Sequence, residues 1–239
     1  MKQLRITRSV IPNLFTAMNL FCGFLSIINT SQLEYYYAAW LIVIAAIFDA
    51  LDGMVARLTN SSSELGVELD SLSDIVSFGA APAFLIYKTF LFSFNSFGVI
   101  ISSLLLIAGG FRLARFNVQL IGFEKSFFKG LPIPSSAITI AAFILIYYNA
   151  GTGFAAPYSS IIIPLVVLLS FLMVSTIKYD SLPKFNMKEI KAKPAVFIFL
   201  LIAAVLLIVT AGKALFFIFV FMILFGIFRH IFFKLTKKN

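Results

Sequence analysis

Charged residues are scarce in this sequence. Only 12% of its 239 residues are charged and 61% are hydrophobic, whereas an average soluble domain is about 25% charged and about 45–50% apolar. A soluble domain of this length could not bury so much apolar surface. The composition therefore excludes an ordinary cytosolic domain, a disordered chain and a disulfide-stabilised scaffold, and it indicates a membrane protein.

Cysteine and histidine occur once each. Cys22 has no partner for an internal disulfide and lies in an apolar run, so we expect it to contribute to packing. His230 stands beside Arg229 at a predicted helix end, where an interfacial role is favoured over catalysis. Neither residue is an obvious nucleophile.

Long runs without charge predict membrane-spanning helices, which need about 20 apolar residues each. Two shorter uncharged runs, 35–48 and 75–87, end beside aspartates, so the turns that carry these acids must enter the membrane. Carboxylates are costly there and usually functional. We predict an all-α bundle of about eight spans, at residues 10–29, 34–57, 70–92, 96–116, 133–149, 157–177, 194–211 and 214–233.

The basic residues give an independent test of this topology. With eight spans both termini lie on one side, and 17 of the 19 Lys and Arg fall on that side, all except Lys88 and Lys213. Cytoplasmic loops of membrane proteins carry such an excess. We therefore expect both termini in the cytoplasm of a cell-membrane protein, and the net charge of +9 needs no nucleic-acid partner to explain it.

Four of the five aspartates lie between positions 49 and 74. Asp49 and Asp52 are three residues apart and Asp70 and Asp74 are four apart, so each pair shares one helix face. Carboxylates in a low-dielectric setting need a cation to stay ionised, and Mg²⁺ combines carboxylate ligands with substrate phosphates. The pattern predicts a metal-bound phosphate or diphosphate site, with interfacial anchoring or salt bridging as the structural alternative.

Residues 49–74 follow the pattern DxxDGxxAR(x8)GxxxDxxxD. This pattern resembles the complete signature of the CDP-alcohol phosphatidyltransferase family. The segment 11–16 (IPNLFT) resembles the start of the first membrane helix in that family. The segments 111–117 (FRLARFN) and 129–134 (KGLPIP) resemble those of its phosphatidylserine synthase branch.

The resemblance implies a transferase within the membrane. CDP-diacylglycerol would be the donor, L-serine the acceptor in this branch, and CMP the leaving product, with two divalent ions, Mg²⁺ or Mn²⁺, as cofactors. The family core has six spans, so residues 1–180 would form the core and residues 181–239 a basic loop with two added helices. Membrane lipids, and a second copy in a homodimer, are the other partners expected.

The resemblance also assigns roles to individual residues. Asp74 would take the proton from the acceptor hydroxyl. The metal ligands would be Asp49, Asp52, Asp70 and Asp74, the CDP-diacylglycerol contacts Pro12, Asn13, Leu14, Phe15, Gly53, Arg57 and Ser63, and the acceptor contacts Arg112, Arg115, Asn117 and Lys129. From the sequence alone, the two arginines of the last group are equally well explained as positive-inside anchors.

Two alternatives stay open at this point. The same chemistry would serve another acceptor, such as glycerol phosphate, inositol phosphate or a different small alcohol. From a different class, an aspartate-lined cation transporter would also place acids in a membrane. Transporters often carry internal repeats and broken helices near the midplane, whereas this sequence shows no repeat and its acids cluster at one end of two helices.

Overall fold

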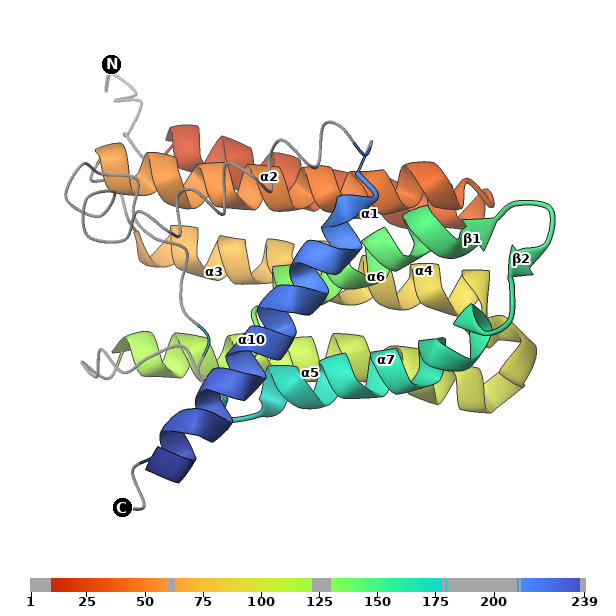
Figure 1. Cartoon of the computed structure of the whole chain (residues 1–239). Helices are drawn as coiled ribbons and strands as arrows, with labels where there is room; N and C mark the ends of the chain where they lie inside the picture. Colours follow the sequence, from red (N-terminus) through yellow and green to blue (C-terminus); the bar gives the residue numbers. More distant parts are fainter. Residues whose placement is uncertain are drawn as a thin grey trace.

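A computed structural model describes residues 10–59, 63–121, 130–177, 179, 210 and 212–236. These residues are almost entirely helical (Figure 1). A two-residue antiparallel pair, β1 (Tyr148–Asn149) and β2 (Gly153–Phe154), forms the turn that the Asn149–Gly153 sequence predicts. The helices are α1 (Val10–Ser31), α2 (Tyr35–Thr59), α3 (Glu64–Asp74), π-helix η1 (Ile75–Ala80), α4 (Ala81–Thr89), 3-10 helix η2 (Leu91–Phe94), α5 (Asn95–Ile121), α6 (Ile133–Tyr147), α7 (Tyr158–Val174) and α10 (Ala214–Thr236).

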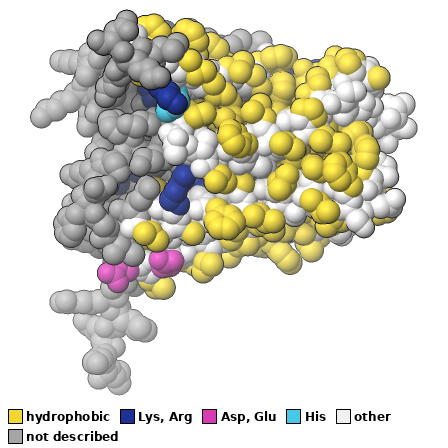
Figure 2. All heavy atoms as spheres, turned by 90° about the horizontal axis from the view of Figure 1, so that it is seen from below, with side chains coloured by type: hydrophobic (Ala, Val, Ile, Leu, Met, Phe, Trp, Pro, Cys, Tyr) yellow, Lys and Arg dark blue, Asp and Glu magenta, His cyan; other side chains and the backbone are white. Residues whose placement is uncertain are grey.

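Five of the described helical segments are long and apolar enough to cross a membrane, and α6 and α7 are shorter apolar helices. One face of the molecule carries mainly hydrophobic side chains, and its charged side chains gather toward one end (Figure 2). The predicted all-α membrane bundle is confirmed. The predicted span 194–211 lies outside the described residues apart from Thr210, so the count of eight spans and the side of the termini stay predictions.

The predicted helix 70–92 was wrong at its start. The helix begins at Glu64 and continues through α3, η1 and α4 to Thr89. Ser63 caps its first turn, because the Ser63 hydroxyl accepts a hydrogen bond from the Gly66 N–H at 3.0 Å. The other predicted helices that the structure describes agree within five residues at each end.

The π-helix η1 lies directly after Asp74 and before Pro82. A proline inside a helix has no N–H to donate, and its ring crowds the carbonyl four residues earlier. The wider π turn accommodates this, and the N–H of Ala81 donates to Val76 O, five residues back. Single π turns inside α-helices are frequent at functional sites, and this one sets the direction of the helix just beyond the acids.

Helix α1 buries its polar face and exposes its apolar face. The buried residues include Thr16, Asn19, Ser26 and Thr30, whereas the exposed ones include Phe21 at 51% exposure. Lipid offers no hydrophobic force between helices, so membrane helices associate through small residues and polar contacts. The polar side of α1 therefore faces α2 and the α3–η1 segment, which are its main neighbours.

Helix α6 is central to the bundle. Eleven of its 15 residues are buried, and it contacts α2, α7, α10 and η1. Helix α10 crosses the bundle obliquely (Figure 1). This packing leaves α1, α2, α3 and α5 to surround the aspartates.

Candidate active site

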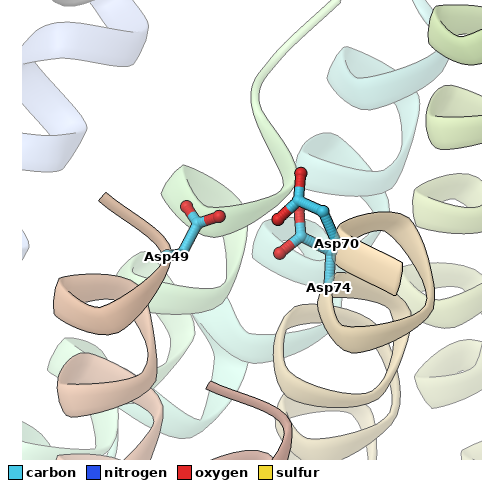
Figure 3. A group of neighbouring side chains, drawn as sticks. All are labelled: Asp49, Asp70 and Asp74. Atoms are coloured by element: carbon cyan, nitrogen blue, oxygen red, sulfur yellow. The ribbon is translucent and has the colours of Figure 1, made fainter. Parts of the chain in front are cut away.

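Three aspartates from two helices meet in the structure. Asp49 extends from α2 toward Asp70 and Asp74, which lie one turn apart on α3 (Figure 3). One carboxylate oxygen from each residue lies within 4.8 Å of the other two. Asp49 is ten residues before the end of α2 and Asp74 is ten after the start of α3, which is about 15 Å along each helix. The cluster therefore lies well below this end of the bundle, with Asp74 buried and Asp49 and Asp70 half-buried.

The chemistry of this trio suits a divalent cation. Three carboxylates at such separations repel one another when ionised, and a cation among them removes that repulsion. In the described part of the chain, Asp70 Oδ1 is buried and has no hydrogen-bond partner. Hard cations such as Mg²⁺ take oxygen ligands of this kind. Asp49, Asp70 and Asp74 could thus hold a metal ion.

Asp52 lies outside this trio. Its carboxylate is buried, at 6% exposure, and accepts a hydrogen bond from the Thr16 hydroxyl at 2.8 Å. Thr16 lies on α1, so this hydrogen bond joins α1 to α2. The role of Asp52 as a metal ligand stays a prediction.

Asp74 has a partner that the sequence reasoning missed. Asn19 is fully buried in α1, and its Nδ2 donates to Asp74 Oδ1 at 3.3 Å. The residues Thr16, Asn19, Gly23, Ser26 and Thr30 recur every three or four positions in an apolar segment. This stripe of small and polar residues could have indicated that Asn19 points toward the site, because polar residues inside a membrane helix face the bundle interior.

The residues predicted to contact CDP-diacylglycerol lie at one end of α1, α2 and α3. A Cβ atom on Gly66 would lie 3.1 Å from Ser63 Oγ and 3.5 Å from Asn13 Oδ1, so this glycine permits close approach. The exposed Arg57 folds over Gly53, with its guanidinium 3.6 Å from the position of a Cβ there.

The other three predicted contacts differ in exposure. Pro12 is buried, whereas Leu14 is 61% exposed. Phe15 packs against Phe48, with 6.4 Å between ring centroids. The positions of these side chains do not test whether they contact a ligand, so the seven contacts to CDP-diacylglycerol stay predictions.

The four predicted acceptor residues fall into different surroundings. Arg112 on α5 is half-buried, and its Nε has no hydrogen-bond partner within the described ranges. Arg115 donates to the carbonyl oxygens of Val174 and, at longer distances, of Met173 and Ser175, at the end of α7. Asn117 exchanges hydrogen bonds with Ser71 on α3. Lys129 lies outside the described residues.

Comparison with known proteins identifies the family. The model of the CDP-alcohol phosphatidyltransferase domain matches residues 9–172. This chain belongs to the CDP-alcohol phosphatidyltransferase family. The match contains Asp52 and the three aspartates of the trio, and the resemblance inferred from residues 49–74 is confirmed.

Curated relatives in this family are similar over most of the chain. A CDP-diacylglycerol–serine O-phosphatidyltransferase of Helicobacter pylori strain J99 is 38% identical over 221 residues, covering 92% of this chain and 91% of the relative. The archaetidylserine synthase of Methanothermobacter thermautotrophicus is 40% identical, covering 71% and 69%. A CDP-diacylglycerol–serine O-phosphatidyltransferase of Bacillus subtilis is 31% identical, covering 73% and 92%. These similarities favour an enzyme over the cation transporter.

Proposed function

We propose that this protein is a membrane transferase that makes phosphatidylserine and CMP from CDP-diacylglycerol and L-serine. Its membership in the family and its similarity to enzymes named for this reaction support the proposal. The observation in the structure that carries it is a group of buried polar atoms that lack hydrogen-bond partners within the described residues.

Four buried side-chain polar atoms have no hydrogen-bond partner in the described part of the chain. Asp70 Oδ1 belongs to the aspartate trio, Asn19 Oδ1 to the amide that donates to Asp74, and Arg112 Nε to a guanidinium near enough to interact with Asp74 and Asp49. Buried polar atoms without partners are uncommon, and each calls for an explanation. Two of the three are acceptors and one is a cationic donor. A zwitterionic substrate together with a metal ion would satisfy this set.

The aspartates would hold the cofactor. Asp49, Asp70 and Asp74 form the observed trio, and we propose Asp52 as a further ligand, so that two ions, Mg²⁺ or Mn²⁺, are bound. A bound divalent cation would neutralise charge on the diphosphate of the donor. Arg57 would add positive charge beside Gly53, where the absence of a side chain leaves room for the CDP headgroup.

The reaction we propose is a direct displacement. Asp74 accepts the proton of the serine hydroxyl, and the serine oxygen bonds to the phosphorus that carries diacylglycerol. The bond from that phosphorus to the bridging oxygen breaks, and CMP leaves with the electron pair. No covalent enzyme intermediate is formed.

We place this site at the cytoplasmic side of the cell membrane. The basic residues Arg57, Arg112 and Arg115 occupy the same end of the bundle as the aspartates, which agrees with the positive-inside rule. We further propose residues 1–180 as the catalytic core and residues 181–239 as an addition. A homodimer stays a prediction.

An acceptor panel tests the proposed function. Purified protein with CDP-diacylglycerol and Mg²⁺ or Mn²⁺ is expected to release CMP rapidly with L-serine and slowly with glycerol phosphate, inositol phosphate or inositol. Labelled serine should appear in the lipid product. Turnover of another alcohol without turnover of serine would overturn the acceptor, and exchange of labelled CMP into CDP-diacylglycerol without serine would overturn direct displacement.

The two arginines of α5 are expected to respond differently to substitution. Arg112→Lys should raise the KM for serine about tenfold or more, because lysine lacks the bidentate fork that suits a carboxylate. Arg115→Lys should lower the thermal midpoint and change the KM for serine only a little, because Arg115 donates to the carbonyl oxygen of Val174 at the end of α7. Steady-state kinetics and thermal unfolding in detergent measure both. Equal effects on the KM would contradict this division.

A further inference from the structure

Asn19 occupies a fixed place beside the proposed base. Its side chain is fully buried in α1. The Ser77 hydroxyl donates to Asn19 O at 2.9 Å, which joins this turn of α1 to η1. A Cβ on Gly23, one turn further along, would lie 2.6 Å from Ser77 Cα, so the two helices are already in close contact. The Asn19 amide therefore has little freedom to move away from Asp74.

The orientation of this amide follows from its partner. An ionised carboxylate only accepts hydrogen bonds, so the NH₂ end of Asn19 must face Asp74. The amide oxygen is bonded to the same carbon as this nitrogen, so it also lies next to the Asp74 carboxylate. Within the described residues that oxygen, Oδ1, has no donor. A buried acceptor without a donor is costly, and a ligand that brings a donor removes the cost.

Resting on the proposed function, we propose that the Asn19 amide bridges Asp74 and the ammonium group of the acceptor. Asn19 Nδ2 holds the Asp74 carboxylate, and Asn19 Oδ1 accepts a hydrogen bond from the ammonium. The ligand class is a 1,2-amino alcohol. Its hydroxyl and ammonium stand on neighbouring carbons, which suits a carboxylate and an amide that are hydrogen-bonded to each other.

This assignment separates three groups of the substrate. The hydroxyl meets Asp74, the ammonium meets Asn19, and the carboxylate is left for Arg112. Asn19 is thus a positioning residue for the base and a specificity determinant for the acceptor. An alcohol that lacks the ammonium leaves Asn19 Oδ1 without a donor, which is the condition under which a polar site rejects an analogue strongly.

The test compares two acceptors in Asn19 variants. L-Serine and 3-hydroxypropionate differ only in the ammonium group, and the preference is the ratio of their kcat/KM values. Asn19→Leu is expected to lower this preference about tenfold and to lower kcat with serine about 10²-fold through misplacement of Asp74. Asn19→Asp keeps an oxygen acceptor but loses the donor to Asp74, so it should retain most of the preference for the ammonium while its kcat falls as in Asn19→Leu. Because the ratio does not depend on the amount of folded enzyme, partial unfolding does not obscure the result.

Ser26→Ala is the matched control. Ser26 lies two turns along the same buried face of α1 and donates to Ala38 O at 2.9 Å, away from the aspartates. Its substitution should leave the preference at the wild-type value. An unchanged preference in Asn19→Leu, or an equal loss of preference in Asn19→Leu and Asn19→Asp, would overturn the inference. Failure of the wild-type protein to use serine at all would instead overturn the proposed function.

Discussion

Asp74→Asn is expected to lower the rate of CMP release from CDP-diacylglycerol and serine about 10³-fold, within the range that general base catalysis contributes. Asparagine has nearly the same shape, but its amide cannot accept the hydroxyl proton. Asp74 is also one of the three carboxylates of the cluster, so the loss of a metal ligand adds to the effect. The residual rate should stay low at saturating serine, because a lost base lowers kcat and not only the affinity.

Glu68→Gln provides the control for this substitution. Glu68 is an exposed carboxylate on the same helix, α3, and does not belong to the cluster. The change from carboxylate to amide is the same, but the transfer rate should stay near that of the wild type. A full transfer rate in Asp74→Asn would show that another group takes the proton.

Removal of divalent metal is expected to abolish transfer. Chelation should lower the rate about 10³-fold or more, since a bound cation supplies several kcal/mol of charge stabilisation at a phosphoryl centre. Addition of Mg²⁺ or Mn²⁺ should restore it. The same ions should raise the thermal midpoint of the protein without substrate, because they relieve repulsion among Asp49, Asp70 and Asp74 and bind only the folded state.

A ligand variant makes the metal test specific. Asp70→Asn should shift the metal concentration needed for half-maximal activity upward, about tenfold or more, through loss of one anionic ligand. It should also weaken the thermal stabilisation by Mn²⁺, whereas Glu68→Gln should behave as the wild type in both titrations. Full activity after exhaustive chelation, or an unchanged metal titration in Asp70→Asn, would contradict a metal site at this cluster.

Hydropathy and charge were enough to predict most of the helices. A segment that crosses a membrane must be long and apolar, and its backbone N–H and C=O groups must be hydrogen-bonded within the protein. The start of the third helix was missed, because Glu64 and Glu68 precede the predicted start at residue 70 and their charges argue against a membrane span. The predicted helix already contained Asp70 and Asp74. In the structure Ser63 caps a helix that carries them inward, with the exposed glutamates on one side and the buried Asp74 on the other.

The pattern of residues 49–74, with its four aspartates, carried the resemblance to the family, and the aspartates themselves predicted a metal-bound phosphate site. Spacing within a helix says which residues share a face, but not which faces meet. Only the tertiary structure shows that Asp49 lies close to Asp70 and Asp74, and that Asp52 instead accepts a hydrogen bond from Thr16. In the same way it joined Arg115 to the end of α7 and left Arg112 Nε without a partner.

The sequence by itself determined that this chain is a helical membrane protein with clustered aspartates, because long apolar runs require a membrane and carboxylates are costly inside one. The structure decided how that site is completed. Asn19 comes from a helix 55 residues before Asp74, and its role depends on the close packing of α1 against η1. The polar stripe of α1 indicates that Asn19 faces the bundle interior, but which residue it contacts depends on how helices far apart in the sequence pack.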